Sequence, residues 1–396
     1  MDKIKELLTR GVDKIYPSSE ELEKILRAGK KLTLYQGFDP TGKELHIGHM
    51  VGFRKLRQWQ ELGHHVIFLI GDGTGQAGDP SGKKTSRGKF LTRDELRANA
   101  VDYVKQASRI VRFEGENPVE IKFNSDWLNK LELIDILEIA EHFTLQQLSE
   151  RDLFQERIRD NQPINLREFL YPLLQGYDSV AMNVDLELGG TDQLFNMLCG
   201  RTLLRAMKSK DKFVMTTPLL EDSEGRKIGK TEGNVIALTD KPTNLYGKIM
   251  ALGDEIIVKG LEYLTDVPTD EITEIEKALA KGEHPVTHKK RLAFEVVRQL
   301  HGESEAKKAA LEFERTIQNK ESPTNIEVYS NSKETNILQV LYLSGLTSSI
   351  SEGKRLIKQK GIFVDDVLIE SPDYEFDITS NHIVRVGRKF RNIIKA

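Results

Sequence analysis

Two basic motifs, far apart in the chain, have residue types and spacing suited to a phosphorylated ligand. His46-Ile47-Gly48-His49 follows an apolar strand and a turn, at the predicted start of a helix. Free N–H groups and the positive dipole end at a helix start favour phosphate, and Gly48 would let a flat base pack on the backbone. Lys227-Ile228-Gly229-Lys230-Thr231 follows the last predicted strand, and its two lysines could clamp a triphosphate's leaving end. Each motif alone also fits a solvated histidine pair or a lysine-rich loop, so the interpretation depends on their order along the chain.

A third group of polar residues shares one helix face. Tyr171, Gln175 and Asp178 are spaced i, i+4 and i+7 within a predicted helix, so they project to the same side. Polar groups on an inward face cost free energy unless they are paired or bind something. The spacing alone leaves two interpretations open, a hydrogen-bonded trio in the core or a ligand pocket.

Two glycine-rich segments resemble nucleotide-binding motifs but depart from them at required positions. Gly73-Thr-Gly75-Gln-Ala-Gly78 has the letters of the dinucleotide fingerprint, but Asp79-Pro80-Ser81-Gly82 follows where that fingerprint needs a helix. Gly82-Lys83-Lys84 resembles the end of a P-loop, yet Ala77 and Lys84 occupy positions that require Gly and Ser or Thr. We therefore predict a flexible loop whose Lys83 and Arg87 can reach an anion.

The elements that must position these residues alternate along the chain. From residue 31 to about 220, apolar runs and helical stretches follow one another, which predicts an α/β domain with a Rossmann-like, doubly wound parallel sheet. Such sheets bind ligands at the carboxyl ends of their strands. The predicted strands are Lys31–Phe38, His65–Ile70, Val119–Phe123, Val184–Leu188 and Phe213–Thr217. The predicted helices are His46–Leu62, Arg93–Phe113, Leu131–Leu148, Leu166–Met182 and Thr191–Met207.

The whole sequence predicts three domains and a linker. The parts are a catalytic domain over 1–221 with an insertion at about 124–167, a mobile signature loop over 222–243, an all-helical domain over 244–319, a linker over 320–334, and a small α+β module over 335–396.

Composition excludes several classes of protein. The chain has 396 residues, with 58 Lys and Arg against 61 Asp and Glu, so its formal charge is −3. A hydrophobic fraction of 38% is enough for real cores, and the single Cys199 excludes a disulfide framework and a Cys-rich zinc site. No apolar run of membrane-spanning length and no signal-peptide pattern occurs, so we expect no membrane partner and a cytoplasmic location.

The two basic motifs resemble the two signatures of class I aminoacyl-tRNA synthetases. Surrounding segments narrow the resemblance to the bacterial tyrosyl-tRNA synthetases, and they occur in the order of that family. These segments are Tyr35–Thr41, Gly78–Lys83, Asn124–Trp127, Tyr171–Asp178 and Gly189–Gln193.

The resemblance implies activation of L-tyrosine by ATP, accompanied by Mg²⁺, and then transfer to tRNA(Tyr); no protein-bound metal is implied. The phosphates would meet Thr41, His46 and His49, and the pyrophosphate would meet Lys227, Lys230 and Thr231, with Lys83 and Arg87 as further candidates. Tyrosine would be held by Tyr35 and Asp178 at its hydroxyl and by Asp79, Tyr171 and Gln175 at its ammonium group. Asp39, Gly190, Asp192 and Gln193 would face the adenylate, with Gly37 and Gly48 beside the ATP.

Two positions depart from the pattern of the family. Gln36 stands where many relatives carry Cys, and Gly52 stands where some carry Thr. The resemblance therefore leaves the ribose contacts at these positions open.

The C-terminal module resembles the S-four-type RNA-binding domain, on the segment Ile350–Gly361. The implied RNA-binding residues are Lys354, Arg355, Lys358, Lys360 and Arg388. A basic tail is also often only a solvated chain end. The inserted segment forms a two-fold interface in relatives, so the resemblance further implies a homodimer.

Two rival functions stay open. Tryptophanyl-tRNA synthetases share the fold but typically lack the C-terminal module and the pairing of Tyr35 with Asp178. A non-enzymatic RNA-binding protein with an inactive catalytic fold is the other rival, and the intact His46, His49, Lys227 and Lys230 argue against it.

Overall fold

The computed structural model describes residues 2–81, 90–222, 224–228, 235–318, 326–331, 333–387 and 389–395. The chain divides into two compact units, residues 1–307 and 308–396. The finer division predicted from the sequence remains a prediction.

The first unit is built around a six-stranded sheet with the strand order β1-β6-β5-β2-β3-β4. All neighbouring strands are parallel except β1, which runs antiparallel to β6. The strands are β1 (Lys14–Tyr16), β2 (Thr33–Phe38), β3 (His65–Ile70), β4 (Glu120–Phe123), β5 (Leu186–Gly190) and β6 (Phe213–Thr217). The chain leaves β2 toward β3 on one side and returns as β5 on the other, which makes the boundary of β2 and β5 a topological switch point, the usual ligand site of such sheets.

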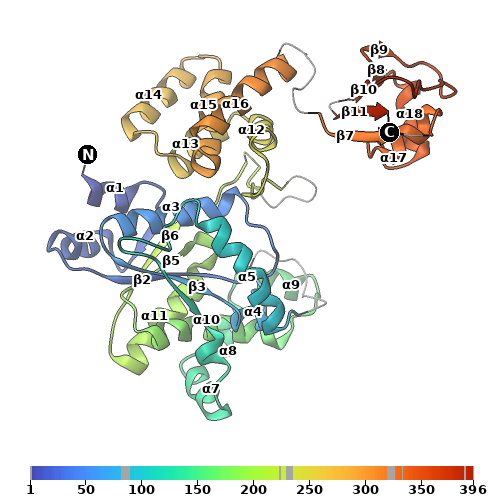
Figure 1. Ribbon diagram of the computed structural model, residues 1–396. Coiled ribbons are helices and arrows are strands. Elements are labelled where there is room, and N and C mark those ends of the chain that lie inside the picture. Colours follow the sequence, from blue (N-terminus) through green and yellow to red (C-terminus); the bar gives the residue numbers. More distant parts are fainter. Residues whose placement is uncertain are drawn as a thin grey trace. The chain divides into compact units, whose positions relative to one another are not determined.

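Helices cover both faces of this sheet, as predicted for a doubly wound fold. Figure 1 places α3 above the strands and α10 and α11 below them. The helices that surround or connect the strands are α1 (Lys3–Thr9), α2 (Ser19–Arg27), α3 (Ile47–Glu61), α4 (Thr74–Ala77), α5 (Arg93–Ala107), α6 (Ser125–Leu128), α7 (Leu133–Ala140), α8 (Leu145–Ser149), α9 (Asp152–Arg159), α10 (Leu166–Met182) and α11 (Leu194–Lys208), with a 3₁₀ turn at Thr191–Gln193.

All five predicted strands are present: β3 and β6 have the predicted bounds, β2 and β4 start one or two residues later, and β5 is shifted by two residues. Three other details differ. The short antiparallel strand β1 was not predicted. The predicted helix Leu131–Leu148 is two helices, α7 and α8, because Thr144 caps a new helix start by accepting a hydrogen bond from the Gln147 N–H at 3.2 Å. The helix predicted over Arg93–Phe113 ends at Ala107.

A helical region follows the sheet, as the sequence predicted. It consists of α12 (Pro242–Met250), α13 (Ile256–Leu264), α14 (Thr269–Ala280), α15 (Val286–His301) and α16 (Glu303–Phe313), followed by a π-helical turn at Glu314–Gln318. No described helix is both long and apolar enough to cross a membrane.

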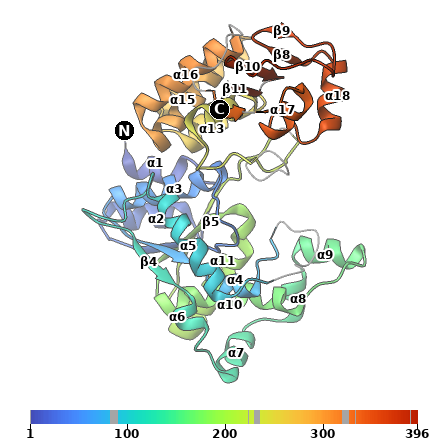
Figure 2. The same cartoon turned by 45° about the vertical axis from the view of Figure 1, so that its right-hand side comes forward.

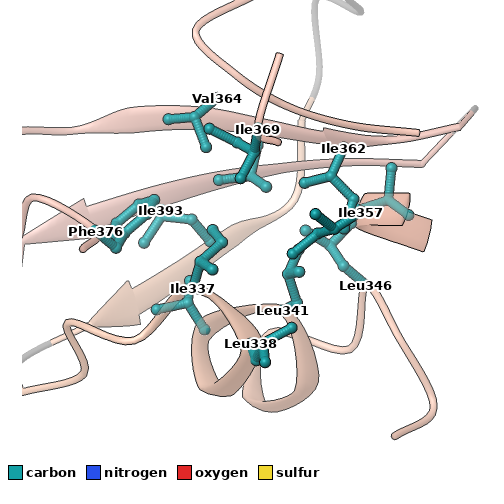
Figure 3. Close-up of a cluster of buried hydrophobic side chains, with 13 residues drawn as sticks. Ile337, Leu338, Leu341, Leu346, Ile357, Ile362, Val364, Ile369, Phe376 and Ile393 are labelled. Carbon is teal, nitrogen blue, oxygen red and sulfur yellow. The ribbon is translucent and has the colours of Figure 1, made fainter. Parts of the chain in front are cut away.

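The second unit has a small sheet of its own, ordered β7-β11-β10-β8-β9. Its elements are β7 (Val328–Asn331), α17 (Ile337–Leu343), α18 (Ile350–Lys358), β8 (Ile362–Val364), β9 (Val367–Leu368), β10 (His382–Val386) and β11 (Lys389–Lys395). Figure 3 shows apolar side chains of α17 and α18, such as Leu341 and Ile357, gathered with Ile362 and Ile393 from the strands. This separate core makes the unit a small α+β module, as predicted.

Candidate active site

Tyr35 of β2 and Asp178 of α10 lie at the bottom of the site. Tyr35 is 1% exposed, and its hydroxyl lies 2.9 Å from the Ser179 hydroxyl. Asp178 is 2% exposed and accepts hydrogen bonds from Asn124 Nδ2 at 3.1 Å and Trp127 Nε1 at 2.8 Å. We call Tyr35, Asp178 and Ser179 the pocket floor.

The pocket floor offers both a hydrogen-bond donor and an acceptor. Burial raises the pKa of Asp178 well above its usual value, and the bonds from Asn124 and Trp127 counteract this rise because they stabilise the carboxylate. Burial, followed by the charges of Glu187 and Asp178, raises the pKa of Tyr35 well above 10, so its hydroxyl keeps its proton. A ligand hydroxyl placed between Tyr35 and Asp178 could therefore be bound from both sides.

A group of hydrogen-bonded carboxylates lies beside the pocket floor. The Tyr171 hydroxyl donates to Asp39 Oδ2 at 3.0 Å, and the Thr74 hydroxyl donates to Asp39 Oδ1 at 2.7 Å. Gln193 Nε2 donates to Asp79 Oδ2 at 3.0 Å. Two carboxylates held in place by neutral groups form an environment that favours a cation such as an ammonium group.

Gln175 contacts a buried ion pair that the sequence analysis missed. Its amide Nε2 donates to Glu187 Oε1 at 3.1 Å, and Glu187 pairs with Lys212, also buried. A sequence signal was available, since Glu187 interrupts the apolar strand Leu186–Gly190. A buried charge within such a strand needs a partner.

The first basic motif lies at the start of α3, as predicted. His46 is the N-cap residue of this helix. Its backbone N–H donates to Nδ1 of His49 at 3.1 Å, and the two imidazole rings are 4.0 Å apart between centroids. Both histidines are half-buried.

The described part of the second basic motif, Lys227 and Ile228, lies against the first. The Ile228 carbonyl oxygen would be only 3.6 Å from a Cβ atom at Gly48. Beyond that motif, the chain returns to pair His46 with Ala237 in a β-bridge, and the Ile47 N–H donates to the Ile236 carbonyl at 3.0 Å. The two motifs are thus close enough to contact one ligand.

Lys227 extends from this motif toward the end of β5. Its ammonium group lies 2.7 Å from Asp192 Oδ2, and the two side chains are 43% and 31% exposed. A Cβ atom at Gly190 would lie 2.7 Å from Asp192 Oδ1, so a larger residue there would displace this carboxylate. We call His46, His49, Asp192 and Lys227 the site entrance.

Some predicted residues lie at the margin of the site or outside the described residues. Thr41 and Gly37 are exposed, Thr41 just after β2 and Gly37 within it. The predicted Lys83, Arg87, Lys230, Thr231 and Arg388 lie outside the described residues.

The two departures from the family pattern compensate for each other. The Gln36 amide lies only 2.6 Å from where a Cβ atom at Gly52 would be. The larger side chain on β2 therefore occupies the space that a larger residue on α3 would need.

Helix α3 is anchored at its middle, about two turns beyond the histidines. Arg54 is buried and forms an ion pair with Asp266 at 2.8 Å. Lys55 is also buried and donates to the carbonyls of Leu7 at 2.8 Å and Arg10 at 2.6 Å, while burial lowers its pKa to about 7. These contacts tie α3 to α1 and to the helical region, and so hold the helix start in place.

Comparisons with known proteins agree with this geometry. The family described as tRNA synthetases class I (W and Y) matches residues 27–318. The tyrosine–tRNA ligase of Thermotoga maritima is 41% identical over 390 residues, covering 98% of this chain and 96% of the relative, and that of Moorella thermoacetica is 39% identical over 394 residues, covering 98% and 94%. A C-terminally truncated mitochondrial tyrosyl-tRNA synthetase from Coccidioides posadasii superposes with a TM-score of 0.64 at 27% identity, covering 78% of this chain and 91% of that one. With its paired motifs at one sheet edge and relatives along its whole length, the chain belongs to the tyrosine–tRNA ligases of the class I aminoacyl-tRNA synthetase family.

Proposed function

We propose that this site activates L-tyrosine with ATP and then transfers the tyrosyl group to the 3′ end of tRNA(Tyr). The observation that carries the proposal is the position of the pocket floor beside the site entrance, at the switch point between β2 and β5. A pocket that binds a hydroxyl from two sides and an entrance that presents two imidazoles and a lysine to phosphates are the two parts that tyrosine activation needs.

The first step forms one bond and breaks another at phosphorus. A carboxylate oxygen of tyrosine bonds to the α-phosphorus of ATP, the bond from that phosphorus to the oxygen bridging to the β-phosphate breaks, and pyrophosphate leaves with the bonding electrons. No covalent bond to the protein is needed. The protein contributes by positioning the reactants and by placing positive charge where the phosphate charge develops.

Five side chains would hold the amino acid. Tyr35 and Asp178 would bind the phenolic hydroxyl, and Asp79, Tyr171 and Gln175 would bind the ammonium group. The Gln175 carbonyl oxygen supports this role, because it is buried and accepts no hydrogen bond from the described residues. Such an oxygen costs free energy until a donor reaches it.

The site entrance would hold the phosphates. His46 and His49 would contact them from the start of α3, and Mg²⁺ would arrive with ATP as part of the substrate. Lys227 would exchange its bond to Asp192 for the pyrophosphate, which frees that carboxylate to face the ribose. Gly37, Gly48, Gly190 and Gln193 would line the nucleotide and adenylate, together with Asp39.

The C-terminal module would bind tRNA as an S-four-type domain. Lys354, Arg355, Lys358 and Lys360 are all exposed on or just after α18, which supports a surface for phosphates. Two of them have acidic neighbours, since Arg355 lies 3.9 Å from Glu352 and Lys360 lies 3.6 Å from Glu370. Transfer of tyrosine to tRNA belongs to translation, which supports the predicted cytoplasmic location.

A homodimer is supported by exposed apolar side chains on the insertion. Figures 1 and 2 both show α7 projecting away from the sheet. The exposed apolar residues on and around α7 to α10 are Leu133, Ile134, Leu137, Leu145, Ile158, Leu166 and Leu170. Exposed apolar patches mark interaction sites, so Leu133→Asp should shift the protein to monomers in analytical ultracentrifugation. Val101→Asp, at a residue that is 70% exposed against 73% for Leu133, is the matched control.

Amino-acid-dependent exchange of pyrophosphate with ATP tests the proposed activity. We expect exchange with tyrosine and little with tryptophan or phenylalanine. Exchange that prefers tryptophan would favour the tryptophanyl enzyme, and no exchange with any of the three would favour an inactive RNA-binding protein.

A further inference from the structure

A buried ion pair lies directly beneath the tyrosine pocket. Glu187 of β5 is the register partner of Tyr35 on β2 and is 2% exposed. Lys212, just before β6, is 1% exposed, and its ammonium group donates to Glu187 Oε2. The same ammonium group lies 5.7 Å from the centroid of the Tyr35 ring.

Lys212 restricts the hydrogen bonds that Ser179 can make, and through Ser179 it acts on Tyr35. Its ammonium group can only donate, and it donates to the Ser179 hydroxyl oxygen. The single Ser179 proton is then left for Tyr35, at 2.9 Å, or for Glu187, at the longer distance of 3.4 Å. Glu187 also interacts with the Tyr35 hydroxyl, but its two oxygens are already bonded to Gln175 and Lys212. When Ser179 donates to Tyr35, the Tyr35 proton can therefore be donated to the hydroxyl of the amino acid. That hydroxyl can in turn donate to Asp178.

Glu187 controls the orientation of Gln175. An ionised carboxylate can only accept, so the amide nitrogen of Gln175 must face Glu187, at 3.1 Å. The amide oxygen is thereby turned away, and it is the buried oxygen that accepts no hydrogen bond from the described residues. Without Glu187, the amide could rotate and present a donor to the ammonium group.

A gain in folding stability does not by itself explain a buried ion pair at this position. Removing two charges from water is costly, and replacing a buried ion pair with apolar residues of similar volume is often neutral or stabilising. A role in positioning the ligand-contacting residues explains its place between Tyr35 and Gln175.

We propose that the Glu187–Lys212 pair is a specificity-determining positioning element, which fixes Tyr35 as a donor to the substrate hydroxyl and Gln175 as an acceptor for the substrate ammonium group. This inference rests on the proposed function, because it assigns a direction to contacts within the same pocket. Glu187 and Lys212 act through Tyr35, Ser179 and Gln175 and do not touch the reacting atoms.

The test uses full-length Glu187→Gln and Lys212→Met and the double variant Glu187→Leu/Lys212→Met. Pyrophosphate exchange is measured with tyrosine and with phenylalanine, together with the melting temperature. We expect kcat/KM for tyrosine over phenylalanine to fall about tenfold or more, mainly through a higher KM for tyrosine, with an unchanged KM for ATP. The double variant leaves no unpaired charge, so it should fold as well as the wild type and still lose selectivity.

Glu168→Gln is the matched control. Glu168 forms a buried ion pair with Arg157 at 3.0 Å, and both side chains are 2% exposed. Glu168 lies at the start of α10, the helix that also carries Gln175 and Ser179. It should lower the melting temperature and keep the tyrosine preference. A double variant that folds and retains the wild-type selectivity would overturn the positioning role. Wild-type protein without tyrosine-dependent exchange would instead overturn the proposed function.

Discussion

The pocket floor and the site entrance differ in burial and in how their polar groups are paired. The floor residues Tyr35 and Asp178 are at most 2% exposed and are held by fixed hydrogen bonds. At the entrance, Lys227 is 43% exposed and its partner Asp192 is 31% exposed. One region is arranged before the ligand arrives, while the other consists of charges that can change partners.

Under the proposed function, we expect the floor to provide selectivity and the entrance to provide catalysis. A buried polar group left unpaired costs its full desolvation energy, so the floor can reject a ligand that lacks one hydroxyl. Exposed charges discriminate poorly because water and salt screen them. They are suited instead to stabilising the charge that develops on a leaving pyrophosphate.

The largest expected effect tests the floor through Asp178→Ala. We expect the preference for tyrosine over phenylalanine to fall by about two orders of magnitude or more, because the substrate hydroxyl loses its acceptor. Tyrosyl-tRNA synthetases are the standard example of such discrimination, so the size of this effect is not a result of this structure. Competitive pyrophosphate exchange measures it, with Asp126→Ala, an exposed carboxylate on α6, as the control. An unchanged ratio would contradict the assignment of Asp178.

An intermediate effect tests the entrance through Lys227→Ala. We expect kcat for tyrosine-dependent exchange to fall about tenfold to a hundredfold, with the KM for tyrosine unchanged. The loss should shrink at high salt, because the wild-type charge is screened there. Stopped-flow adenylation over a salt series measures both. The control is Arg226→Ala, which removes a neighbouring cation that is 63% exposed and should have little effect. A rise in the KM for tyrosine with Lys227→Ala would contradict the separate roles of floor and entrance.

The smallest expected effect on adenylation comes from deleting residues 335–396. Both the floor and the entrance belong to the first unit, so adenylate formation should stay within about twofold while tyrosylation of tRNA weakens with its phosphate contacts. Lys354→Glu/Lys358→Glu should reproduce the loss in the full chain, and Lys333→Glu should not. Equal loss of adenylation and tRNA charging would give the module a structural role instead.

Much of the fold could be predicted because its signals are local. The apolar runs His65–Ile70 and Phe213–Thr217 are strands with the predicted bounds. Strand β1 was missed because three residues carry too little periodicity, and its pairing with β6 is a contact between distant parts of the chain. The break between α7 and α8 depends on the cap at Thr144. The sequence carries this local signal, because Thr144 is followed three residues later by Gln147.

The sequence by itself determined the alternation of strands and helices, the helix face shared by Tyr171, Gln175 and Asp178, and the order of the two basic motifs. The first two features follow from periodicities of 2 and 3.6 residues, which short segments of strand and helix carry, and the order of the motifs is read directly along the chain. Only the tertiary structure decided that Ile228 lies against Gly48, that Lys227 bonds to Asp192, and that Glu187 and Lys212 form an ion pair beneath Tyr35. Those contacts join residues that no local pattern relates, because they arise only when the sheet brings together strands and loops that are distant in the chain.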